Sequence, residues 1–360
     1  MCTNMYGNLT CYDDATSRYI QAFFNSINTV LIICGNTLAL VIVYRTKALQ
    51  DAAFCFLMNL ALSDLLLGVI SQPPSLYYAI SCHWPGGPDG FYCQFVGFCI
   101  CLLCSVSVIS LGLVSYERYH YTVHPFQHIN KFTLYRSLNA CVIVWLYSAI
   151  ASLFPVVGIW KGVGLQPYNA LCNIQWEEEP MYLVAMIVGV LLPSWAMITF
   201  SYYNIVKVAR KARKIDVIKN QVTLRNRAPV SNIASNIPAC IATGVLDDSY
   251  HDDSTISTIH ATSRSCKNRA NFKKTMRSNK CTLTVSLLVG TFIVCWTPYV
   301  IVNIIQAVQC TPNSFEAIAF AQWMCIFNSA CNPLIYGLTN KTFREGVSKL
   351  MRELKCRRRI

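Results

Sequence analysis

The stretch Ile318–Gly346, "IAFAQWMCIFNSACNPLIYGLTNKTFREG", starts as an apolar segment long enough to cross a bilayer, yet it carries Asn328, Ser329, Asn332 and Pro333. A polar group inside hydrocarbon is costly, so we expect these side chains to have partners or a function. The whole chain is apolar, with 54% hydrophobic and 13% charged residues and a mean hydropathy of +0.39. This composition argues against a soluble fold and indicates a membrane protein.

Stretches long enough to span about 30 Å of hydrocarbon as helices recur along the chain. The sequence therefore predicts an all-α membrane protein, a seven-transmembrane helix bundle, with spans near residues 22–44, 53–79, 92–117, 138–159, 181–206, 281–306 and 315–337. Of the 30 lysines and arginines, only Arg18 and Lys161 lie in the N-terminal tail or in loops on its side. The positive-inside rule then predicts an extracellular N-terminus and a cytoplasmic C-terminus in the plasma membrane. Asn8, in an Asn-x-Thr sequon, is the expected glycosylation site.

Composition divides the chain further. Residues 1–21 are expected to form an extracellular tail, and residues 22–337 the membrane domain. Within that domain, residues 208–280 are expected to form a long third cytoplasmic loop, disordered and regulatory because it is polar and rich in Ser and Thr. Residues 338–360 are expected to form an amphipathic helix and a short basic tail, with Cys356 as a palmitoylation site.

The net charge of +13 is concentrated next to the ends of the spans. This placement predicts attraction to anionic lipid of the inner leaflet rather than binding of nucleic acid. Among the 19 cysteines, Cys93 begins the third span on the outer side and Cys172 lies in the second outer loop. A disulfide between them would pin that loop over the bundle. Whether the other outer cysteines pair is left open; they are Cys2, Cys11, Cys82 and Cys310.

Asp64 is the only acid placed deep in a predicted span, roughly 16 Å along its helix and therefore near the bilayer midplane. Its expected partners at similar depth are polar residues of three other spans: Asn36, Ser107, Asn328, Ser329 and Asn332. Such a cluster could serve as interhelical glue. It could equally hold a small cation such as sodium, because its ligands would be hard oxygen atoms.

The third span ends in Glu117-Arg118, about 37 Å from Cys93 and thus at the cytoplasmic boundary. An acid directly before the arginine suggests a charge pair that can be exchanged. Prolines are expected to interrupt four other spans, at Pro155, Pro193, Pro298 and Pro333. The aromatic residues before the third of them, Phe292 and Trp296, make that bend resemble a hinge.

Together these residues resemble the rhodopsin-like family of G-protein-coupled receptors, from about Phe23 to Leu354 without the long loop. The motifs that carry the resemblance are "GN" at Gly35-Asn36, "LALSD" ending at Asp64, Cys93, "ERY" at Glu117–Tyr119, Trp145, Pro193, "CWTPY" at Cys295–Tyr299 and "NPLIY" at Asn332–Tyr336.

The resemblance assigns roles to three groups of residues. A switch that meets the G protein would comprise Glu117, Arg118, Tyr119, Tyr202 and Tyr336. An activation relay would comprise Phe292, Trp296, Pro298, Asn332 and Pro333. An allosteric sodium site would comprise Asp64, Ser107, Asn328, Ser329 and Asn332.

The chain departs from the family pattern at two switch positions. Tyr202 lies nine rather than eight residues after Pro193. Ser278 stands where many relatives carry an acid that bonds the third-helix arginine. The second departure predicts raised basal activity.

The expected ligand is small and neutral or lipophilic. Ile100 occupies the position of the aspartate by which amine receptors bind their ligands, which disfavours a biogenic amine. The motifs look most like those of opsins, but Ile326 stands at the retinal-binding lysine and the seven spans contain no lysine, so no Schiff-base retinal or other covalent cofactor is expected. Val96 and Gln166 stand at the usual counterion positions. The predicted pocket residues are Ile100, Cys101, Cys104, Met186, Tyr299, Asn303, Gln322 and Ile326.

A receptor acting on heterotrimeric G proteins is the leading function, with arrestin and a receptor kinase expected at the third cytoplasmic loop. Two alternatives are a relative of opsins that binds a retinoid without a covalent bond and an ion-coupled transporter. An enzyme is disfavoured, because the sequence contains no metal-ligand cluster and no nucleophile with an assigned base.

Overall fold

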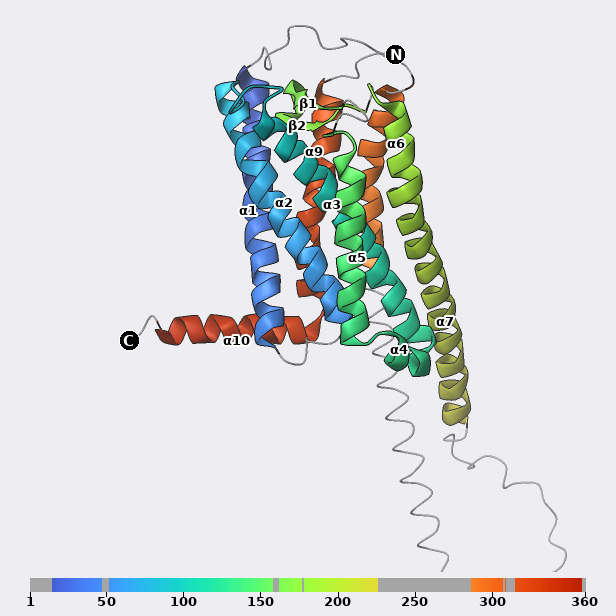
Figure 1. Ribbon diagram of the computed structural model, residues 1–360. Helices are drawn as coiled ribbons and strands as arrows, with labels where there is room; N and C mark the ends of the chain where they lie inside the picture. The colour runs from blue at the N-terminus through green and yellow to red at the C-terminus, as the bar shows by residue number, and fades with distance from the viewer. Residues whose placement is uncertain are drawn as a thin grey trace, which may run out of the picture. The chain divides into compact units, whose positions relative to one another are not determined.

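The computed structural model describes residues 15–46, 52–157, 162–176, 178–225, 286–306, 308 and 315–357. The chain forms two compact units, one of Met1–Asn204 with Leu283–Ile360 and one of Ile205–Thr282. The first unit contains a bundle of long helices (Figure 1). Six of them are α1 (Ala15–Arg45), α2 (Ala52–Ser81), α3 (Phe91–Val123), α5 (Leu134–Leu153), the helix Ser286–Gln306 and α9 (Phe315–Thr339). The remaining long helix, fifth in chain order, consists of three consecutive elements: α6 (Pro180–Met186), the π-helix Ile187–Leu191 and the start of α7 (Leu192–Arg225).

Six of the described helices are long and apolar enough to cross a membrane. The seventh, α9, is equally continuous, but Asn328, Ser329 and Asn332 reduce its hydropathy. The predicted seven-helix bundle is therefore confirmed, and α9 is the member with polar residues in the middle of its apolar segment. Shorter elements complete the unit: α4 (Pro125–Lys131), β1 (Val163–Gln166), β2 (Leu171–Ile174) and α10 (Lys341–Arg357).

Close helix contacts depend on small residues at defined positions. A Cβ added at Gly68 of α2 would lie 2.6 Å from Ile32 of α1, and one added at Gly35 of α1 would lie 3.1 Å from the ring of Pro333 in α9. Such contacts allow backbones to approach in a membrane, where packing rather than water drives helix association. Helix α3 contacts α2, α5 and both strands, and it forms the centre of this unit.

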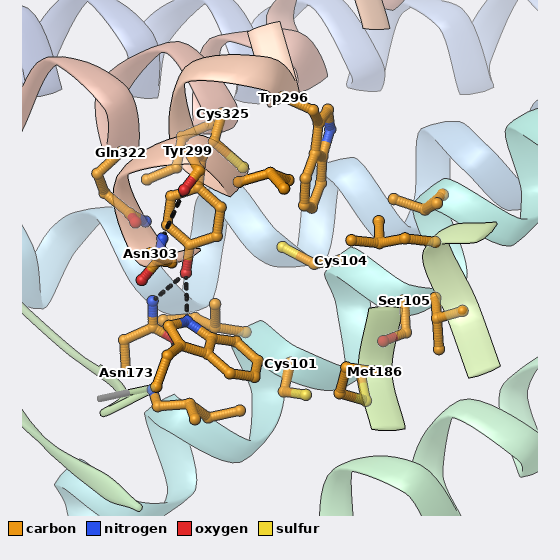
Figure 2. A pocket seen from close by; sticks show the side chains of 18 of the residues that line it. Cys101, Cys104, Ser105, Asn173, Met186, Trp296, Tyr299, Asn303, Gln322 and Cys325 are labelled. Carbon is orange, nitrogen blue, oxygen red and sulfur yellow. Dashed lines mark hydrogen bonds between the residues drawn. The ribbon is translucent and has the colours of Figure 1, made fainter. Parts of the chain in front are cut away.

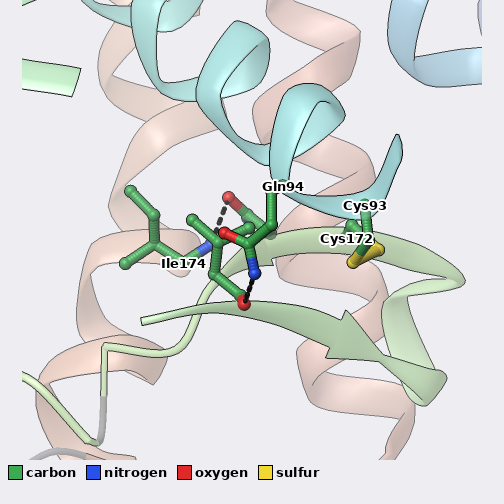
Figure 3. The surroundings of a disulfide bond; sticks show 6 residues. Cys93, Gln94, Cys172 and Ile174 are labelled. Atoms are coloured by element: carbon green, nitrogen blue, oxygen red, sulfur yellow. Dashed lines mark hydrogen bonds between the residues drawn. A yellow bond between two sulfur atoms is a disulfide. The ribbon is translucent and has the colours of Figure 1, made fainter. Parts of the chain in front are cut away.

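A two-stranded hairpin covers the N-terminal end of α3 (Figure 3). Strands β1 and β2 pair antiparallel, with Val163 opposite Ile174. The disulfide Cys93–Cys172 joins the hairpin to the first turn of α3, and Gln94 Nε2 donates to the Val163 carbonyl at 2.9 Å. The loop is thus fixed by a covalent bond and a hydrogen bond at neighbouring residues.

The structure differs from the predicted boundaries in two places. Helix α5 ends at Leu153, so Pro155 follows this helix rather than interrupting it. Helix α7 continues to Arg225, so residues 208–225 of the predicted disordered loop are helical. Long Lys and Arg side chains have good helix propensity, which favours continuation beyond the apolar span. Residues 226–280 of that loop lie outside the described residues.

Helix α10 begins directly after Asn340 and is amphipathic as predicted. Phe343 is buried, whereas Met351 and Leu354 are about half exposed. The helix runs across the end of the bundle opposite to the hairpin (Figure 1). Cys356, the predicted palmitoylation site, is exposed on it.

Candidate functional site

Beneath the hairpin, the bundle contains a pocket of about 850 Å³, a volume that includes the open space at its mouth. Figure 2 shows its side chains converging from several helices and from the outer loop. All eight predicted pocket residues line it: Ile100, Cys101, Cys104, Met186, Tyr299, Asn303, Gln322 and Ile326. Among the described residues around this pocket, none carries a charged side chain. The site therefore suits an uncharged molecule, because a buried charge would find no counterion there.

The hairpin closes this pocket through Tyr299, as the dashed lines in Figure 2 show. The Tyr299 hydroxyl accepts hydrogen bonds from Trp176 Nε1 at 2.8 Å and from Asn173 Nδ2 at 3.3 Å. The Trp176 ring also stacks on Tyr182 with 5.7 Å between ring centroids. Sequence reasoning missed Asn173 and Trp176, although Asn173 directly follows Cys172 and the disulfide places it over the bundle.

The inner wall and floor are aromatic and apolar. Trp296 lines the pocket and contacts Phe292, with 5.7 Å between ring centroids. Phe292 is almost fully buried and meets the Trp195 ring edge-on at 6.3 Å. Pro298 lies two residues beyond Trp296, inside the helix Ser286–Gln306. The π-helix contributes wall residues that the sequence did not single out.

Asp64 is fully buried deeper in the bundle and accepts three hydrogen bonds. Ser107 Oγ and Ser329 Oγ donate to Oδ1 at 3.0 and 2.8 Å. Asn332 Nδ2 donates to Oδ2 at 2.8 Å. These bonds join α2, α3 and α9, and they give the polar residues of α9 their partner.

Two of the predicted Asp64 partners lie elsewhere. Asn36 donates to the Ser329 carbonyl at 3.1 Å and so links α1 to the same turn of α9. Asn328 is buried, but the described structure contains no hydrogen bond between Asn328 and Asp64. The remaining donor set fits an oxygen-coordinated cation, because each serine hydroxyl can rotate and present a lone pair instead of its proton.

At the other end of α3, Glu117 is 1% exposed and lies between two basic side chains. Arg118 Nε is 3.2 Å from Oε2, and His128 Nε2 is 2.6 Å from Oε1. The second partner comes from α4, which sequence reasoning did not consider as a source of a switch residue. The only sequence signal for this contact is that His128 lies 11 residues after Glu117, across one short connection.

The other predicted switch residues differ in their surroundings. The Tyr119 hydroxyl contacts His124 Nε2 at 3.1 Å, and its ring meets Phe200 edge-on at 5.2 Å. Tyr336 is buried, and its hydroxyl has no hydrogen-bond partner among the described residues. Tyr202 is 36% exposed, and the described contacts do not join it to Arg118. Asn8 and Ser278 lie outside the described residues.

A seven-helix membrane bundle with a capped pocket at one end and a buried ion pair at the other has the architecture of a membrane receptor. The family model for 7 transmembrane receptors (rhodopsin family) matches residues 35–336. The chain belongs to this family.

Among individual proteins, the chain is similar to mouse (Mus musculus) G-protein coupled receptor 161, with 27% identity over 345 residues, 94% of this chain and 58% of that protein. It is 24% identical to the human (Homo sapiens) histamine H2 receptor over 355 residues, 97% of this chain and 84% of that receptor. The crystal structure of squid rhodopsin superposes with a TM-score of 0.69 at 19% identity, covering 95% of this chain and 87% of that one.

The chain spans about three-fifths of the length of the G-protein coupled receptor 161 relatives that it matches. Neither alternative function is favoured by these similarities. A transporter belongs to another family, and rhodopsin, at 19% identity, supports the fold alone.

Proposed function

We propose that this protein is a receptor for a small, uncharged, lipophilic ligand and that it activates a heterotrimeric G protein. The observation that carries the proposal is the pocket beneath the hairpin, whose described lining has no charge and whose cap is fixed by the Cys93–Cys172 disulfide. Its polar groups are amides, hydroxyls, thiols and the indoles of Trp176 and Trp296, which can orient a neutral ligand. Ile100 lines the pocket at the position where amine receptors have an aspartate. An amine ligand would therefore find no carboxylate to pair with at this position.

The bound ligand would act on Trp296, which lines the pocket and packs on Phe292. The helix Ser286–Gln306 would then bend at Pro298, and α9 would move at the turn that contains Asn332 and Pro333. These movements would change the inner face of the bundle. There Arg118 would leave Glu117 and contact the G protein. The Ser278 position, which lacks an acid, supports some basal activity.

Family membership and the charge distribution support the remaining proposals. The receptor would lie in the plasma membrane with its N-terminus outside, and it would have no enzymatic activity. Its cytoplasmic basic residues would contact anionic lipid. Arrestin and a receptor kinase would act on the third cytoplasmic loop, and sodium would occupy the Asp64 site in the resting state.

The test measures basal cAMP, calcium and G-protein dissociation in cells that express wild type, Arg118→Ala or Asp64→Asn at matched surface levels. We expect a basal signal that disappears with Arg118→Ala. A signal in wild type that persists unchanged in Arg118→Ala would contradict the proposed switch. Silence of the wild type in every channel would contradict basal activity, and the same cells would then be screened with neutral lipophilic compounds.

A further inference from the structure

A second pocket, separate from the capped one, lies between α1 and α9. It contains about 950 Å³ of empty space. Its walls are residues of α1 between Ser17 and Asn25 and residues of α9 between Glu316 and Ile326, with Ser75 of α2 and Asn169 of the turn between the strands. None of the functions described above uses this space.

The mouth of the α1–α9 pocket is apolar and exposed. Ile20, Phe24 and Phe320 line it and are 51%, 43% and 57% exposed. Exposed apolar side chains on membrane-spanning helices contact acyl chains, so a molecule dissolved in the bilayer can reach this pocket without passing through water.

Contacts between Trp323 and Phe24 join the two walls of the pocket. Trp323 Nε1 donates to the Phe24 carbonyl at 3.3 Å, and the two rings meet edge-on at 5.3 Å. Trp323 also stacks on Phe327 at 5.0 Å within α9. These contacts fix the distance between α1 and α9 beside the cavity.

The inner end of the same pocket is polar. Asn25 Nδ2 donates to Ser75 Oγ at 3.0 Å. Gln322 and Asn169 are each 6% exposed, and their side-chain oxygens have no hydrogen-bond partner among the described residues. A buried acceptor without a donor is destabilising, so both oxygens favour a ligand that supplies an O–H or N–H group.

Gln322 also connects the two pockets. Gln322 and Ile326 line both the α1–α9 pocket and the capped pocket. Figure 2 shows Gln322 beside Asn303 at the edge of the capped pocket. The two spaces therefore adjoin at these two side chains.

We propose that the α1–α9 pocket binds a membrane-dissolved molecule with an apolar chain and a neutral hydrogen-bond donor at one end. The chain would lie against Ile20, Phe24 and Phe320, and the donor would reach Gln322. That this molecule also passes on into the capped pocket would rest on the proposed function. Its binding in the α1–α9 pocket does not depend on that function.

The test uses a long-chain alcohol that carries a diazirine in its alkyl chain, and the methyl ether of the same molecule as the matched probe without a donor. Purified full-length receptor in nanodiscs is irradiated with each probe, and adducts are mapped by peptide mass spectrometry. We expect saturable labelling of residues 17–25 and 316–326 by the alcohol. The ether should bind about fivefold more weakly, which corresponds to the loss of one neutral hydrogen bond.

Three variants assign this labelling to the pocket. Ala319→Trp fills the space and should abolish the saturable adducts, whereas Gln322→Leu should reduce alcohol labelling to the level of the ether. Val142→Trp, on the exposed face of α5, is the matched control and should change nothing. If Ala319→Trp does not fold, the comparison of alcohol and ether in wild type and Gln322→Leu still decides the result.

Labelling that is not saturable, or that is equal for alcohol and ether, would overturn the proposal. Because cross-linking needs no signal, saturable labelling of a receptor that stays silent would uphold this pocket while contradicting the proposed function. A receptor that signals but shows no saturable labelling would uphold the proposed function and overturn binding in the α1–α9 pocket.

Discussion

Glu117, near the C-terminal end of α3, is contacted by two basic side chains. Its carboxylate is nearly inaccessible and meets both Arg118 and His128. A hydrogen bond to a charged group contributes about 1.5–3 kcal/mol. We therefore expect His128→Ala to raise basal G-protein signalling several-fold, because Arg118 would be retained by a less firmly held carboxylate. The measurement is G-protein dissociation at matched surface expression.

His124→Ala is the control for this prediction. His124 contacts the Tyr119 hydroxyl, not Glu117, so this variant should leave the basal signal near that of wild type. Equal basal signals in His128→Ala and wild type would show that His128 does not restrain the switch.

Asp64 gives a second prediction for a single residue. If its three partners hold sodium, replacing choline chloride by sodium chloride at equal ionic strength should raise the thermal unfolding midpoint of the purified receptor. A stabilisation of about 1 kcal/mol corresponds to roughly 2–4 °C for a domain of about 150–250 residues, so we expect a shift of at most this size for the larger receptor. Asp64→Asn should abolish the difference between the two salts. Asp89→Asn, which removes an exposed carboxylate, should retain it; an identical response of all three proteins would mean that the cluster is only interhelical glue.

At the scale of elements, the close contact between α3 and β1 is sensitive to one added atom. A Cβ at Gly97 would overlap Val163 Cγ1. We expect Gly97→Ala to lower the free energy of unfolding by about 1–3 kcal/mol, as overpacking does. The measurement is the thermal midpoint of the purified receptor, together with surface expression.

Val163→Ala removes the methyl group that would clash, so the double variant should regain part of the loss even though Val163→Ala alone is destabilising. Gly337→Ala is the control, because a Cβ there would meet nothing within 4 Å among the described atoms. Additive effects of Gly97→Ala and Val163→Ala would contradict a clash between α3 and β1.

Particular elements show which parts of the fold can be predicted from the sequence and which cannot. Hydropathy predicts the seven spans, and the position of a buried acid predicts the Asp64 cluster, because both follow from the cost of polar groups in hydrocarbon. The hairpin, α4 and the π-helix were not predicted, since short elements between spans depend on tertiary contacts such as the Gln94–Val163 hydrogen bond. His128 and Trp176 were missed for the same reason: each meets its partner through a loop whose path the sequence does not give.

At the scale of the whole molecule, the two ends of the bundle differ in the way that a receptor requires. The disulfide-pinned hairpin and the capped pocket lie at one end, and α10 lies at the other (Figure 1). Between them, Asp64 is hydrogen-bonded to α3 and α9. Under the proposed function, a change in the pocket would reach the Glu117 end of α3 through helices that share this buried carboxylate.

This polarity predicts how the protein lies in the membrane. Of the 30 lysines and arginines, 28 are on the α10 side of the predicted spans and only Arg18 and Lys161 are on the other. An epitope tag at the N-terminus should bind antibody on intact cells, whereas a C-terminal tag should bind only after permeabilisation. Treatment with a glycosidase should increase the gel mobility of wild type but not of Asn8→Gln, because the sequon would reach the outer compartment. A C-terminal tag accessible on intact cells would reverse the orientation, and it would place the Glu117–Arg118–His128 cluster where no G protein could meet it.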